Sequence, residues 1–188
     1  VHLADTADLP RVARVVPDAA RRLIDAFWPG ALTLVLPKTA AVPPAVTAGL
    51  DTVGVRVPAH PVTHALLVAA GVPVGGPGAN RGSRPSPTSA ADVLEDLGDR
   101  VALILDGGPT THGVESTVVD VTGASPVLLR PGAVTVEQLR AVVPDLVVRT
   151  RAEADPTVPQ QAPGTLLKHY APRAEVRLWS GPRARDAA

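Results

Sequence analysis

The chain has 188 residues, with 18 basic and 18 acidic side chains and a formal net charge of zero. This length suits one domain with a real core, which must be aliphatic because Phe, Trp and Tyr make up only 2% of the residues. The zero net charge argues against a protein that holds nucleic acid mainly by neutralising phosphates.

The absence of cysteine excludes disulfides, thiolate catalysis and cysteine metal sites, and it agrees with a reducing cytosol. The sequence contains neither a secretory leader nor an apolar run long enough to span a membrane. We therefore expect a soluble, cytoplasmic protein with no membrane partner. Because the chain begins at Val1 and contains no methionine, we also expect it to be a segment of a longer protein.

The first half of the chain alternates helix and strand patterns. Apolar side chains recur at helical spacing after Pro17, and Trp28-Pro29-Gly30 ends that helix because proline cannot continue it. Short apolar runs mark the strands. We expect helices over residues 9–16, 17–27 and 62–69, and strands over residues 32–36, 53–57 and 72–74.

The second half continues the alternation. Thr88 is the expected N-cap of a helix that Gly98 ends, and Thr135 with Gln138 has the spacing of a capping box for a helix over residues 136–142. The apolar run 101–105 predicts a strand covered on both faces. Further strands are expected over residues 116–121, 127–130 and 146–148. The pattern predicts an α/β domain with a twisted, mixed open sheet and flanking helices.

Periodicity disappears after about residue 149, where Pro, Gln, Ala and charged residues take over. We therefore divide the chain into an α/β domain over residues 1–149, a linker over residues 150–172, and the beginning of a second domain over residues 173–188.

The segment 75–88 is the most unusual part of the sequence, because it is rich in glycine and proline and has no large apolar side chain. Glycine lets the main chain approach a ligand where a Cβ would block it, so this segment can bring N–H groups, hydroxyls, an amide and two guanidinium groups close to an anion. The alternative is a long surface turn, which uses the same residue types.

Two arginines, Arg56 and Arg130, end expected strands that are otherwise apolar. A buried guanidinium needs an anionic partner, so each can bind a carboxylate or a phosphate; an ordinary ion pair is the alternative. Ser116 and Thr117 begin another expected strand and place hydroxyls where ligands commonly bind in open sheets, unless they simply face solvent in a turn.

Several other chemistries receive little support. His60 and His64 have the spacing of metal ligands on a helix, but no third ligand is evident, so we interpret them as part of an ordinary helix start. The sequence has neither the serine elbow of hydrolases nor a Walker-type phosphate loop. We assign no catalytic side chain and no metal ligand.

Six stretches, in family order over nearly the whole chain, together resemble the YrdC-like family, in particular its longer L-threonylcarbamoyladenylate synthases. They are residues 27–33, 52–58, 77–80 with 84–88, 113–120, 129–132 and 169–172. The resemblance implies that L-threonine, bicarbonate and ATP give threonylcarbamoyl-AMP and pyrophosphate. It also implies that Mg²⁺ arrives with the phosphates, and that the product serves a downstream tRNA threonylcarbamoyl transferase complex. Whether tRNA itself binds is left open.

The resemblance also implies the site residues. Arg56, Gly76 and Ser116 would bind threonine. Tyr170, on the linker, would close over the adenylate as a lid. The residues implied for ATP are Thr52, Gly78, Asn80, Ser86, Arg130 and Tyr170. Threonine carbamate is already an anionic nucleophile, so the reaction needs alignment and charge neutralisation rather than a general base. This interpretation requires Arg56 and Arg130 to share one cleft.

The chain departs from the family in two places. Gly78 stands where the family usually has serine, which predicts weaker ATP binding. The family's domain begins before Val1, with a threonine-site residue and a Lys/Arg-rich stretch, so the activity of this segment alone is left open. Two other functions were weighed: an RNA-binding module, which the scarcity of aromatic residues disfavours, and the carbamoyl-transfer domain of a hydrogenase maturation factor, which the stretch 169–172 disfavours.

Overall fold

A five-stranded sheet forms the centre of the computed structural model, which describes residues 1–82 and 84–148. The strands lie in the order β2-β1-β3-β4-β5, and their bounds are β1 Leu32–Pro37, β2 Thr52–Val55, β3 Thr117–Asp120, β4 Val127–Arg130 and β5 Val147–Val148. β1 is antiparallel to β2 and parallel to β3, β3 is antiparallel to β4, and β4 is parallel to β5. The mixed open sheet expected from the sequence is confirmed.

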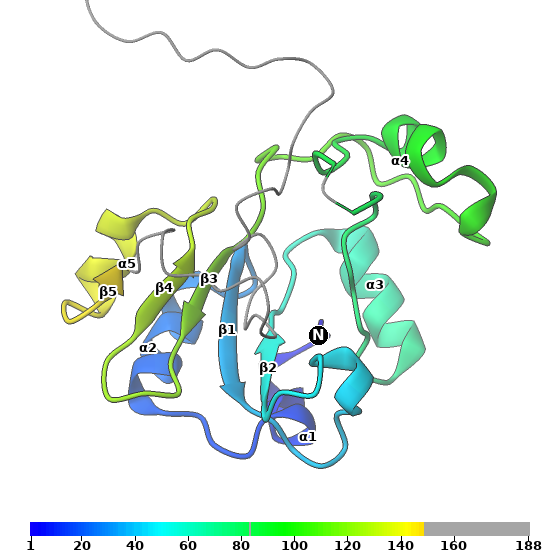
Figure 1. Ribbon diagram of the computed structural model, residues 1–188. Helices are drawn as coiled ribbons and strands as arrows, with labels where there is room; N and C mark the ends of the chain where they lie inside the picture. Colours follow the sequence, from blue (N-terminus) through cyan, green and yellow to red (C-terminus); the bar gives the residue numbers. More distant parts are fainter. Residues whose placement is uncertain (83, 149–188) are drawn as a thin grey trace, which may run out of the picture.

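Most of the helices lie around this sheet, and one, α4, stands away from it (Figure 1). Their bounds are α1 Leu9–Val12, α2 Asp18–Phe27, α3 Pro61–Ala70, α4 Ala90–Leu97 and α5 Val136–Val142, with short 3-10 turns at Thr6–Asp8, Pro44–Val46 and Gly98–Arg100. α5 begins at the capping box expected from the sequence, since Thr135 accepts from the Gln138 N–H and the Gln138 side chain accepts from the Thr135 N–H.

One face of the sheet carries the main core. The buried side of α2, formed by Ala20, Leu23 and Ile24, belongs to the same apolar cluster as alternate residues of β1 and part of α5. Figure 1 shows α2 behind the sheet. Leucine and valine fill this core, as the scarcity of aromatic residues required. Burying each such side chain contributes about 1.5–3 kcal/mol.

Some local expectations were wrong. Residues 101–105 form no strand and pair with no neighbour among the described residues, and Leu103 is 74% exposed. An apolar run becomes a strand only where a partner strand accepts its backbone hydrogen bonds. The expected strand at 72–74 is reduced to one bridge between His2 and Val74.

The start of one helix and the end of another also differ from expectation. The N-cap of α4 is Ser89 rather than Thr88, since the Ser89 hydroxyl accepts from the Asp92 N–H and the Asp92 carboxylate accepts from the Ser89 N–H. α1 ends at Val12 because Ala13 is extended and bridges Lys38.

No helix among residues 1–82 and 84–148 is long and apolar enough to span a membrane. The expected linker and second domain lie outside the described residues.

We expect the buried hydroxyl of Thr117 to contribute measurably to the free energy of unfolding. This fully buried hydroxyl donates to the Val134 carbonyl at 2.7 Å and accepts from the Val134 N–H at 2.9 Å. Thr117→Val leaves both backbone groups unpaired, so we expect the free energy of unfolding to fall by about 1–3 kcal/mol in urea denaturation. Thr117→Ser keeps the hydroxyl and should lose less. Equal losses in the two variants would show that the hydroxyl contributes nothing.

Candidate functional site

The strand directions bring four chain segments to one end of the sheet. β2 runs opposite to β1, so Arg56, which follows β2, lies beside the start of β1. β3 runs with β1, so Ser116, which precedes β3, lies at the same end. β4 runs opposite to β3 and ends there with Arg130, paired with Val118. Residues far apart in the sequence therefore meet because of sheet topology alone.

Ser116 is the centre of a hydrogen-bonded group at this end. Arg130 donates from Nη2 to the Ser116 carbonyl at 2.8 Å and to its Oγ at 3.1 Å, and from Nε to the same carbonyl at 3.1 Å. The Ser116 Oγ also lies 2.9 Å from the Thr33 Oγ1 of β1. The guanidinium of Arg130 and two hydroxyls are thus fixed relative to one another.

Arg56 lies at the same end of the sheet. Its Nε donates to the Gly30 carbonyl at 2.6 Å, and among the described residues no hydrogen bond or ion pair involves its two Nη groups. Burial and then the positive charge of Arg130 lower the pKa of Arg56 from its ordinary value. Two guanidinium groups this close repel each other, and an anion between them would relieve that repulsion.

His2 lies next to Arg56 and was not selected by the sequence analysis. Its Nδ1 is buried and has no hydrogen-bond partner among the described residues. Its main chain bridges both Arg56 and Val74, and its ring packs so closely on Gly76 that a Cβ there would lie 2.4 Å from the His2 Cδ2. Gly76 is therefore required by close approach. An unpaired buried nitrogen calls for a partner such as a ligand.

The glycine-rich segment 75–88 follows directly. The Nδ2 of Asn80 donates to the carbonyls of Arg81 and Arg84, at 3.0 and 3.1 Å, so this amide shapes the loop. A Cβ at Gly78 would lie 2.7 Å from the Asn80 Oδ1, so a serine in this place would require the Asn80 side chain to move.

Ser86 joins this segment to the Ser116 region. Its hydroxyl donates to the Glu115 Oε1 at 2.6 Å, and the Thr110 N–H donates to the Thr88 carbonyl at 2.9 Å. The loop before β3 and the glycine-rich loop are therefore in contact.

The remaining expected residues are placed differently. Thr52 begins β2, four residues before Arg56, so roughly 13 Å of chain separates the two residues, although the side chains of Thr52 and Arg56 project from the same face. Its role stays a prediction. Tyr170 lies outside the described residues. His60 precedes α3, and its Nε2 contacts the Gly107 carbonyl at 3.2 Å, which agrees with an ordinary helix start.

Sequence reasoning missed Thr33 and His2 at this end of the sheet. Both lie in segments whose patterns indicate a structural role: Thr33 within an apolar strand, and His2 at the beginning of the chain. The available signal for Thr33 was a hydroxyl on the strand face opposite to the alternating leucines. No comparable signal existed for His2, because its neighbours Arg56 and Gly76 are distant in sequence.

Comparison with known sequences adds to this geometry. Residues 1–132 match the Sua5–YciO–YrdC family, described as telomere recombination, and residues 134–188 match the threonylcarbamoyl-AMP synthase C-terminal domain. The chain therefore belongs to the Sua5–YciO–YrdC family. The YrdC-like resemblance predicted from six short stretches is confirmed.

Individual members of the Sua5–YciO–YrdC family are also similar. The threonylcarbamoyl-AMP synthases of Pyrococcus abyssi and Bacillus subtilis are 44% and 46% identical, over 97% and 96% of this chain but only 54% and 52% of their own length. The crystal structure of P. abyssi Sua5 complexed with L-threonine superposes with a TM-score of 0.88 and 44% identity, covering 93% of this chain and 51% of that one. The chain thus spans about half the length of these relatives.

The buried His2 predicts a pH-dependent stability. Burial, followed by the positive charges of the Val1 ammonium group and of Arg56, lowers the pKa of His2 to about 4 from its ordinary 6.5. The folded protein thus favours the neutral ring. The stabilisation from keeping it neutral is complete above pH 6.5 and is lost as the pH falls to about 4, an effect of about 3 kcal/mol in the free energy of unfolding.

The measurement is urea denaturation between pH 7 and 4, on the wild type and on His2→Gln, whose side chain does not titrate. The wild type should lose more stability than the variant over this range. The same pH dependence in both proteins would contradict the assignment.

Proposed function

We propose that the protein forms L-threonylcarbamoyl-AMP and pyrophosphate from L-threonine, bicarbonate and ATP, acting as a nucleotidyltransferase. The observation that carries the proposal is that Arg56 lies at the same end of the sheet as Arg130, which is hydrogen-bonded to Ser116. It occurs in a family whose members at 44–46% identity are named threonylcarbamoyl-AMP synthases. Two cations with hydroxyls between them suit a substrate that carries a carboxylate at one end and a phosphate at the other.

For threonine, the proposed residues are Arg56, Gly76 and Ser116, together with His2. The two Nη groups of Arg56 are available to a carboxylate, which they can bind in a bidentate manner. The Nδ1 of His2 offers a buried partner to a polar group of the amino acid. The main chain at Gly76 can approach closely because no Cβ intervenes.

For ATP, the proposed residues lie mainly on the glycine-rich loop and β4. The loop can surround phosphates with backbone and amide groups, and Arg130 can neutralise charge at the α-phosphate. Among the described residues no cluster of three or more His, Asp or Glu side chains could hold a metal. The proposal is therefore that the phosphate oxygens of ATP coordinate Mg²⁺, which binds together with the nucleotide. The full set is Thr52, Gly78, Asn80, Ser86, Arg130 and, as a lid, Tyr170.

The chemistry follows from this arrangement. Threonine nitrogen and bicarbonate give a carbamate with loss of water, and a carbamate oxygen then bonds to the α-phosphorus while the bond to the β-phosphate oxygen breaks and pyrophosphate leaves. The nucleophile is already an anion, so no side chain must remove a proton in that second step. Arg56 and Arg130 would align the two anions and offset their repulsion.

The product would be used in the cytoplasm by a tRNA threonylcarbamoyl transferase complex. RNA binding and carbamoyl transfer for hydrogenase maturation, the two other functions weighed from the sequence, receive less support. The relatives with the highest identity cited above carry the synthase name, and the zero net charge offers no general attraction for RNA.

The direct test is ATP–pyrophosphate exchange by the protein as its gene encodes it. Exchange should require both L-threonine and bicarbonate. Exchange that continues unchanged without threonine would refute the proposed function.

We expect removal of the Arg56 charge to raise KM for threonine specifically. Arg56→Gln should raise KM for threonine by about tenfold or more, since a charge-assisted bidentate contact is lost. Arg22→Gln removes the same charge from an exposed position on α2 and should change KM by less than about twofold. Steady-state exchange assays measure both. Equal KM values in the two variants would remove Arg56 from the threonine site.

A further inference from the structure

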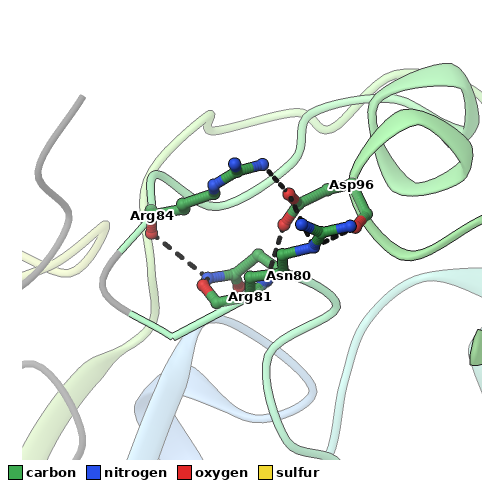
Figure 2. A network of polar contacts seen from close by, with 4 residues as sticks. All are labelled: Asn80, Arg81, Arg84 and Asp96. Atoms are coloured by element: carbon green, nitrogen blue, oxygen red, sulfur yellow. Dashed lines mark hydrogen bonds and ion pairs between the residues drawn. The ribbon is translucent and has the colours of Figure 1, made fainter. Parts of the chain in front are cut away.

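Asp96 of α4 holds the glycine-rich loop at two points (Figure 2). Its Oδ2 accepts from the Arg81 backbone N–H at 2.5 Å, and its carbonyl accepts from the Arg81 Nε at 2.8 Å. Its Oδ1 accepts from the Arg84 Nη1. One residue therefore binds both sides of the turn between residues 81 and 84.

Neither α4 nor the loop is held by the core. α4 buries none of its residues, and Figure 1 shows it standing away from the sheet beyond the loop. Residues 75–82 and 84–88, the described part of the loop, contain no helix or strand. Because neither α4 nor the described part of the loop contributes a side chain to the buried core, polar contacts such as those of Asp96 are expected to set how the loop lies relative to α4.

The Asp96 contacts differ from an ordinary surface ion pair. Its side chain is only 13% exposed, whereas Arg81 and Arg84 are 47% and 33% exposed. The hydrogen bond from the Arg81 N–H and then that from Arg84 lower the pKa of Asp96, so the group stays a carboxylate at neutral pH. Exposed pairs contribute little because solvent screens them, but this carboxylate is largely shielded and accepts from several donors.

The contacts continue from Asp96 to the expected nucleotide-binding residues. The Asn80 amide donates to the carbonyls of Arg81 and Arg84, the two residues that Asp96 holds. The Asn80 Oδ1 in turn lies against Gly78. Asp96, Asn80 and Ser86 also line one cavity of about 230 Å³. Loss of the carboxylate would therefore release the turn that orients Asn80.

We propose that Asp96 is a positioning residue for the nucleotide: it holds Arg81 and Arg84 so that the loop presents Asn80 and Ser86 to the phosphates. This inference rests on the proposed synthase function. If Asp96 has this role, α4 and the glycine-rich loop form one unit whose geometry determines the affinity for ATP. Threonine binding depends instead on Arg56 and the sheet.

The test is Asp96→Asn in the protein as its gene encodes it. Asparagine keeps the shape but removes the charge and one acceptor. We expect KM for ATP to rise by about tenfold, with kcat and KM for threonine changed by less than about twofold. Asp99→Asn is the matched control, because it makes the same chemical change three residues further along, in the 3-10 turn Gly98–Arg100. Asp99 is exposed, does not line the cavity and has no hydrogen bond or ion pair among the described residues, so KM for ATP should not change in this variant.

A double-mutant cycle with Arg84→Gln tests the route of the effect. Because both variants break the same contact, adding Asp96→Asn to Arg84→Gln should raise KM for ATP much less than it does in the wild type. If Asp96→Asn fails to fold by circular dichroism, Arg84→Gln alone decides, since it removes only one partner; an unchanged KM for ATP would then overturn the inference.

Other outcomes are also decisive. Equal KM values for ATP in Asp96→Asn and Asp99→Asn would overturn the positioning role. An equal rise in the KM for threonine would also overturn it, because that result indicates a general structural defect. Failure of the wild type to exchange pyrophosphate would instead refute the proposed function. That failure is seen before any variant is made, so the two are distinguishable.

Discussion

Two guanidinium groups lie at one end of the sheet, close enough for the charge of Arg130 to lower the pKa of Arg56. The rest of the site depends on this meeting of like charges. The two arginines lie together because β2 and β4 both run opposite to the parallel pair β1 and β3. The last residues of β2 and β4 and the first residues of β1 and β3 are therefore at the same end of the sheet. The aliphatic core beneath fixes the strands, and so fixes the backbone positions from which the two arginines project.

The two sides of the site are built in different ways. On the sheet side, Ser116, Thr33 and Arg130 are held by strands whose alternate residues are buried, and their geometry follows from backbone pairing. On the loop side, a segment without a core is held by hydrogen bonds to Glu115 and Asp96. A rigid side suits an amino acid of fixed shape, whereas a polar, adjustable side suits the phosphates of a nucleotide.

Part of this arrangement could be predicted from the sequence and part could not. Helical spacing predicted α2, and the capping box predicted the start of α5, because both signals are local. The strand expected at residues 101–105 was wrong because an apolar run carries no information about whether a partner strand is present. His2 was missed for a related reason: its importance comes from neighbours more than fifty residues away.

The residue pattern was enough to establish the α/β class, the aliphatic core and the residue types at the strand ends, and to rule out cysteine chemistry. Six short stretches in order were enough to identify the family. Folding in three dimensions was needed to bring Arg56, Ser116 and Arg130 to one end of the sheet, to pack His2 on Gly76, and to place Asp96 against the glycine-rich loop. The physical reason is that strand order and direction, rather than separation along the chain, set which side chains meet.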